Sequence, residues 1–153
     1  MIVLEKILVS ACLLGENVKY NGSNNKLSHP LLEKWLKEGR IVSICPESEG
    51  GLPTPRHPSE IQGSKVVNTA GEDVTDAFIS GAEIACKKAL DNNIRFAILK
   101  QGSPSCGSSA VYDGSFSGTK IAGMGIAASM LSSMGVLVFD ENDIDSLAKL
   151  VRQ

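Results

Sequence analysis

The sequence predicts an α/β fold, a three-layer Rossmann-like sandwich built on a mainly parallel sheet of about four to five strands. Short apolar runs rich in β-branched residues alternate along the chain with stretches of helical periodicity, which is typical of repeated strand–helix–strand units. Such crossovers are almost always right-handed, so helices are expected on both faces of the sheet. A length of 153 residues suits a single domain over residues 1–153 with a sizeable core.

The first half of the chain is expected to hold two strands and a helix. Lys6–Ala11 is a short apolar run that predicts a buried strand, and Arg40–Cys45 predicts a second one. Between them, a helix starts near Ser28-His29-Pro30 and ends at Gly39. Its apolar stripe consists of Leu31, Leu32, Trp35 and Leu36. The following segment, Pro46–Gln62, contains four of the six prolines and is predicted to be a long ordered loop.

The second half repeats the alternation after a short edge strand or hairpin arm at Lys65–Asn68. Asp73 is expected to cap a helix whose apolar face includes Phe78, Ala82 and Ala85. The remaining elements, in chain order, are a strand at Ile94–Lys100, a Gly/Ser-rich loop over Gln101–Thr119, a helix at Gly123–Ser133, a strand at Val136–Phe139 and a last helix capped by Asp140.

Composition and charge exclude several classes of partner. The net charge of −2, without a dense Lys/Arg run, argues against a nucleic-acid partner. No stretch reaches the roughly 20 apolar residues of a membrane span. The start, MIVLEKILVSACLLG, has the look of a short signal peptide, but Glu5 lies early in it and it fits a first strand better. A cytoplasmic location is therefore expected, where thiols stay reduced and four cysteines favour metal binding or catalysis.

Three of the four cysteines lie at strand ends. Cys12 follows the first strand, Cys45 closes the second, and Cys106 comes six residues after Lys100 at the end of the third. Because the carboxyl ends of parallel strands meet at one edge of the sheet, these cysteines are predicted to form one site. Cys86 instead lies on the apolar face of a predicted helix and is expected to be a core residue.

The residues alone leave the bound group open. There is no CxxC pair, which structural zinc sites typically use. Three thiolates from separate loops suit zinc with an open position, and they suit equally a [4Fe–4S] cluster with one iron lacking a protein ligand. His29 or His57 would be available to complete a zinc site, although His57 also fits a solvated loop position.

Polar residues near the cysteines suggest further chemistry. Glu47 follows Cys45 by two residues and would reach a group bound there, unless it is a surface carboxylate. Ser103 and Ser105 flank Pro104 just before Cys106, so a hydroxyl is expected to face the same crevice. Arg56 would hold an anionic or carbonyl oxygen, anchored by Glu60, with a loop-bracing salt bridge as the alternative.

At these residues the sequence resembles the thiouracil desulfurase (TudS-like) family, long described as a domain of unknown function. The resemblance spans most of the chain and is most specific in its second and third blocks. The matching segments are SACLLG with KYNG (Ser10–Gly15, Lys19–Gly22), CPESEGGLPTPRHPSEI (Cys45–Ile61), KQGSPSCG (Lys100–Gly107) and YDGSFSGTKIAGMG (Tyr112–Gly125). It implies a [4Fe–4S] cluster on Cys12, Cys45 and Cys106 with one iron open to a substrate sulfur.

The resemblance also implies a reaction: removal of sulfur from a thiouracil-like small molecule, giving the carbonyl compound and sulfide without net redox change. It implicates Glu47 and Ser103 in catalysis. We expect Glu47 to act as general acid or base and Ser103 to position water or the ring. Substrate contacts are expected from Arg56, Glu60, Ser105 and Tyr20. The sulfur leaves as hydrosulfide or passes to an acceptor.

Two alternatives come from other functional classes. The first is a zinc or iron–sulfur binding or sensing domain without catalysis. The second is a nucleotide-binding module, because Gly123–Ala128 matches G-x-G-x-x-A at a predicted helix start. That fingerprint needs a hydrophobic strand directly before it, whereas Ser115–Lys120 is polar and Gly-rich. Close packing of a loop on the helix start explains the glycines equally well.

Overall fold

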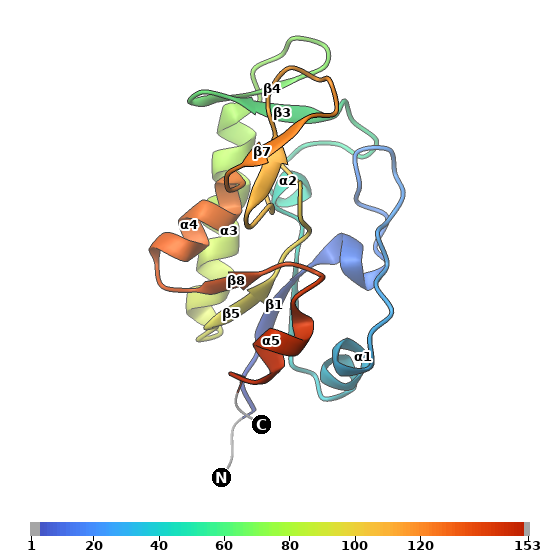
Figure 1. Cartoon of the computed structure of the whole chain (residues 1–153), viewed down its shortest axis with the longest axis vertical. Coiled ribbons are helices and arrows are strands. Elements are labelled where there is room, and N and C mark those ends of the chain that lie inside the picture. Colours follow the sequence, from blue (N-terminus) through green and yellow to red (C-terminus); the bar gives the residue numbers. More distant parts are fainter. Residues whose placement is uncertain (1–3, 152–153) are drawn as a thin grey trace.

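Four parallel strands form the central sheet of the molecule, which we describe from a computed structural model covering residues 4–151 (Figure 1). The ends of the predicted domain, residues 1–3 and 152–153, lie outside the described residues. The strand order is β2-β1-β5-β8, and all three neighbouring pairs are parallel. The strands are β1 (Ile7–Ser10), β2 (Ile41–Ile44), β5 (Phe96–Ile98) and β8 (Leu137–Phe139). Each lies inside a segment that the sequence predicts to be a strand.

Helices cover both faces of this sheet, which confirms the predicted three-layer sandwich (Figure 1). One face packs on α3 (Thr75–Asp91) and α4 (Ile126–Ser133) through an alanine-rich core. The other packs on α1 (Pro30–Lys37) and α5 (Ile144–Ala148), where Trp35 is fully buried. Alternate residues of β1 point to opposite faces, so Leu8 enters the first core and Ile7 the second. None of the helices in the described range is long and apolar enough to cross a membrane.

The segments predicted to be loops contain more regular structure than expected. Pro46–Gln62 includes the short helix α2 (Pro46–Glu49) and strand β3 (Ser59–Gln62), which pairs with β4 (Lys65–Asn68) as an antiparallel hairpin. The Gly/Ser-rich segment includes β6 (Ala110–Tyr112), paired with β7 (Lys120–Ala122). Strand β4 has the bounds of the predicted hairpin arm. The other three strands, β3, β6 and β7, have three or four residues each and include polar ones, so no hydrophobic period identifies them in the sequence.

The predicted helix caps are only partly right. Asp73 accepts the N–H of Thr75, the first residue of α3, although Val74 occupies the backbone cap position. Asp140 is not the cap of α5: it accepts the N–H of Asn142 in a preceding turn, and the helix begins at Ile144. The first strand is followed by the 3₁₀ helix η1 (Ala11–Leu14), which carries Cys12.

Candidate active site

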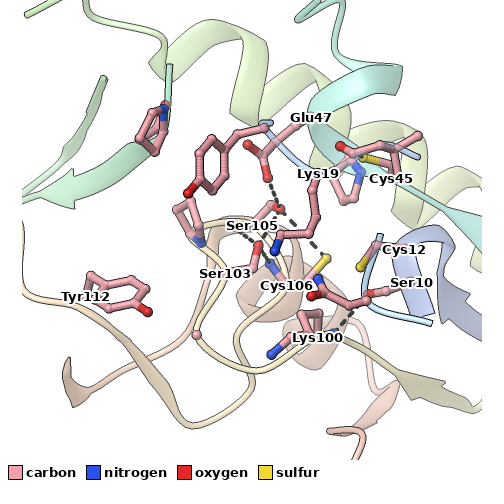
Figure 2. A pocket seen from close by; sticks show the side chains of 18 of the residues that line it. Ser10, Cys12, Lys19, Cys45, Glu47, Lys100, Ser103, Ser105, Cys106 and Tyr112 are labelled. Carbon is pink, nitrogen blue, oxygen red and sulfur yellow. Dashed lines mark hydrogen bonds between the residues drawn. The ribbon is translucent and has the colours of Figure 1, made fainter. Parts of the chain in front are cut away.

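The structure brings Cys12, Cys45 and Cys106 to one cavity of about 590 Å³ at the carboxyl edge of the sheet. Because β1 lies between β2 and β5, the segments that follow these three strands are direct neighbours. Figure 2 shows the three cysteines on one side of the pocket, with Tyr112 on the other. Their convergence follows the prediction, and their role as ligands stays a prediction. Cys86 packs against the core of α3 and α4, as expected.

Burial makes the cysteine thiols hard to ionise when no cation is bound. Desolvation raises the pKa of Cys106 to about 12, opposed by hydrogen bonds from Ser10 and Ser105. Burial also raises the pKa of Cys12, opposed by a hydrogen bond with the side chain of Asn25. A positively charged group that binds all three sulfurs would offset this cost, and its binding would release protons.

The spacing of the donors suits a group larger than a single ion. Within residues 4–151, no set of three Cys, His, Asp or Glu side chains converges closely enough to hold one metal ion. Three thiols nevertheless line the same roomy cavity from three separate segments. Neither His29, which accepts the Leu31 N–H and contacts Asp145, nor His57 lines it. An all-sulfur donor set on one side of a roomy cavity fits an iron–sulfur cluster better than mononuclear zinc.

A chain of hydrogen bonds connects Glu47 to the loop before Cys106. Glu47 is the second residue of α2, and its side chain is 15% exposed. Its Oε2 accepts from Ser105 Oγ at 3.1 Å, and Ser105 Oγ lies 3.0 Å from Ser103 Oγ. Ser103 Oγ also accepts the backbone N–H groups of Ser105 and Cys106, at 3.2 and 3.1 Å. Since both acceptor positions of Ser103 are occupied, its hydroxyl can only donate, toward Ser105 or into the cavity.

The start of α4 fixes this loop and explains the G-x-G-x-x-A match. A Cβ on Gly125 would lie 2.5 Å from the carbonyl carbon of Ser105, so only glycine permits the contact. The first helical N–H groups already have partners, since Ile126 donates to Pro104 O and Ala128 to Ser105 O. The strand before the motif, β7, is an exposed hairpin strand. The close-packing interpretation is therefore confirmed, and these amides do not point to a phosphate site.

Arg56 and Glu60 both line the cavity but do not contact each other as the sequence interpretation expects. Arg56 instead donates to Glu47 Oε1 at 3.3 Å, to Val18 O at 2.8 Å, and to the Pro53–Thr54 turn. Glu60 Oε1 accepts the backbone N–H groups of Gly114 and Phe116, so it ties one hairpin to the other. Arg56 is thus a loop brace that also orients Glu47, which corrects the predicted anchoring by Glu60.

Tyr20, a predicted substrate contact, lines the cavity and is 43% exposed. Several further lining residues were not among the predicted site residues. The additional lining residues include Ser10, Lys19, Lys100 and Tyr112 (Figure 2). Ser10 and Lys100 end or follow strands, a position that could have revealed them. Lys100 pairs with Glu141 at 2.7 Å, whereas the ammonium of Lys19 has no hydrogen-bond or ion-pair partner in the described part of the chain.

Comparison with known proteins agrees with this geometry. A family profile described as 2-thiouracil desulfurase matches residues 7–143. The uncharacterized protein YbbK of Bacillus subtilis (strain 168) is 40% identical over 151 residues, which cover 92% of this chain and 99% of that protein. A solved structure of the [4Fe-4S]-dependent thiouracil desulfidase TudS is 48% identical, covers 95% of this chain and 97% of its own, and superposes with a TM-score of 0.94. The chain therefore belongs to the 2-thiouracil desulfurase family.

Proposed function

We propose that this chain is an enzyme, a non-redox [4Fe–4S]-dependent desulfurase that converts the thiocarbonyl of a thiouracil-like small molecule into a carbonyl. The observation that carries the proposal is the convergence of three buried or half-buried cysteines and the Glu47–Ser105–Ser103 chain on one cavity. Family membership and the 48% identical desulfidase structure support the same reaction. We also propose that residues 1–153 act as one domain.

Cys12, Cys45 and Cys106 would hold the cluster. When bound, such a cluster supplies an iron without a protein ligand, a Lewis acid that attracts the soft thiocarbonyl sulfur. In the balanced reaction, the oxygen of one water replaces sulfur on the carbon. The sulfur leaves as hydrosulfide with one proton of that water, and the second proton must be accepted by the protein or the solvent. No electron is gained or lost overall.

Glu47 is the group best placed to move these protons. Its carboxylate accepts from Arg56 at one oxygen and from the Ser105 hydroxyl at the other, which fixes its orientation toward the loop before Cys106. Ser105 connects this carboxylate to Ser103, whose hydroxyl donates. In this order of donation, from Ser103 to Ser105 to Glu47, the Ser105 hydroxyl lines the cavity and keeps one acceptor position, so the path of a proton from the cavity to the base runs through Ser105.

The cavity has room for a small planar substrate beside a cluster. Tyr20 offers an aromatic face, Lys19 an unpaired ammonium within the described residues, and Ser105 a hydroxyl. Arg56 and Glu60 would shape the cavity walls, because their polar atoms are already bonded to the protein. A sulfur acceptor, the lack of nucleic-acid and membrane partners, and a cytoplasmic location remain predictions.

The test is to purify the protein without oxygen and measure iron, sulfide, zinc and the visible spectrum together. About four irons and four sulfides per chain are expected, lost in Cys12→Ser, Cys45→Ser and Cys106→Ser but kept in Cys86→Ser. The loaded protein should then release sulfide and uracil from thiouracil. One equivalent of zinc without iron would end the proposal. A cluster without turnover of any thiolated substrate would favour the sensing alternative.

A further inference from the structure

Phe116, in the loop between β6 and β7, has a backbone conformation that aromatic residues rarely adopt. Its φ angle of 57° lies in the left-handed region, where the Cβ atom comes too close to the backbone carbonyl oxygen. Within the described residues, the one other non-glycine position with positive φ is Asn93, just after α3, and asparagine is ordinary at a helix end. A phenylalanine keeps such a conformation only when its surroundings hold it there.

The side chains of β3 supply this constraint. Glu60 is buried, and its Oε1 accepts the backbone N–H of Phe116 at 3.2 Å and that of Gly114 at 2.9 Å. The side-chain amide of Gln62 donates to Gly114 O at 2.7 Å. Gly114 also packs so closely on β3 that a Cβ there would lie 2.6 Å from Ile61 O. Contacts from one strand therefore fix the backbone on both sides of residue 115.

The aromatic residues of the chain divide into two groups. One group belongs to the hydrophobic core: Trp35, Phe78 and Phe96 are buried, and Phe139 packs against them from a partly buried position. The remaining aromatic residues all line the cavity and come from two separate loops and one hairpin strand: Tyr20, Tyr112 and Phe116.

The strained conformation of Phe116 is not explained by packing within the protein. Its side chain lines the cavity and the residue is 36% exposed, so part of the ring has no apolar neighbour. A planar ring placed against it would cover this surface, and stacking of a nucleobase on an aromatic side chain strengthens binding. Tyr112, on the same hairpin, lies across the cavity from the three cysteines (Figure 2). A substrate whose sulfur points to the cysteines therefore has its ring on the side of this hairpin.

We propose that Phe116 is a specificity-determining residue that packs on the planar ring of the substrate, and that Glu60 is the positioning residue that holds it in its strained conformation. The inference rests on the proposed function, which supplies the substrate. It narrows the substrate class to thioamides that are part of an unsaturated, flat ring. Glu60 acts through the backbone of Phe116 and does not contact the substrate itself.

The experiment titrates uracil and dihydrouracil into the anaerobically loaded protein by calorimetry. Both carry the same polar edge, neither has a sulfur to lose, and only uracil has a flat unsaturated ring. We expect wild type to prefer uracil, and Phe116→Leu to bind uracil about tenfold more weakly and lose the preference. Phe116→Tyr keeps a ring and should match wild type. The matched control Asn93→Gly, at the other strained position, should also leave binding unchanged.

Two further variants separate positioning from a merely structural role. Glu60→Ala should weaken uracil binding as Phe116→Leu does, and Glu60→Gln should restore it, because the amide oxygen accepts the same N–H groups. The double variant of Glu60→Ala and Phe116→Leu should bind no more weakly than Phe116→Leu, since Glu60 acts through Phe116. Phe116→Gly removes the ring and the strain together, so its urea midpoint should not fall although uracil binding does.

Several results would overturn the inference. These are equal binding of uracil and dihydrouracil by wild type, full uracil affinity in Phe116→Leu, additive losses in the double variant, or a lower urea midpoint in Phe116→Gly. An unfolded Glu60→Ala protein would assign Glu60 to the fold and overturn its positioning role. The failure of the proposed function is distinguishable, because a loaded wild type that releases no sulfide from any thioamide refutes that function, while the uracil titrations still decide the role of Phe116.

Discussion

Replacing Gly81 of α3 by alanine tests how the fold positions Glu47. Within a helix, this substitution normally stabilises by about 0.5–1 kcal/mol. Here a Cβ on Gly81 would lie 1.8 Å from Pro46 O, although real Cβ contacts essentially never fall below 3.0 Å. The first turn of α2 must therefore move by at least about 1.2 Å. Overpacking of this kind costs about 1–3 kcal/mol, so we expect Gly81→Ala to destabilise the protein.

The same displacement should reduce activity more than stability. Glu47 follows Pro46, and its 3.1 Å contact with Ser105 would not survive a shift of that size. A misplacement of about 1 Å can reduce turnover by about 10²-fold. The assays are urea unfolding of the purified protein and desulfuration rate per loaded cluster. Ser80→Ala, at the exposed neighbouring position of α3, is the matched control. Unchanged or increased stability with full activity in G81A would contradict the close contact between Pro46 of α2 and Gly81 of α3.

Two further predictions concern ionisable groups of the site. Glu47→Gln should keep the cluster yet slow turnover by about 10²–10⁴-fold, while Glu49→Gln on the same helix should leave the rate unchanged; an unaltered rate in E47Q would remove Glu47 from the proton path. Burial raises the pKa of the Cys106 thiol from 9.0 to about 12. Above pH 9 this thiol ionises in the unfolded chain before it does in the folded one, so the free energy of unfolding of the cluster-free protein should be constant below pH 9 with respect to this group and fall between pH 9 and 12. Urea unfolding at about pH 8 and pH 10 measures this fall, which Cys106→Ser should reduce; an equal fall in the variant would contradict it.

The parallel sheet could be predicted from the sequence because its two central strands, β1 and β5, are buried on both faces. Residues 7–9 and Phe96–Ile98 are continuous apolar runs, which are typical of strands buried on both faces. The position of each run then placed Cys12, Cys45 and Cys106 at one edge, because parallel strands share a direction. Predicting this part of the site required only the positions of the strand ends and no side-chain geometry.

The hairpins and the pairing of Arg56 could not be predicted in the same way. β6 and β7 are three residues long, and β7 is exposed throughout, so their pairing depends on cross-strand hydrogen bonds between separated segments. The choice of Arg56 between Glu47 and Glu60 depends on where α2 lies in space, and sequence spacing carries no information about that. Glu60 is instead occupied by backbone N–H groups of the loop between β6 and β7.

Two glycines allow the two segments that form the hydrogen-bond chain to pack closely on helices. Gly81 allows the segment carrying Glu47 to contact α3, and Gly125 allows the Ser105–Cys106 loop to contact the start of α4. The 3.1 Å contact between Glu47 and Ser105 joins these two segments, so its length depends on both helix contacts at once. α3 and α4 pack against each other through the alanine-rich core, which fixes the distance between these two contacts. The alanines of that core therefore position the proton path as much as the polar residues that form it.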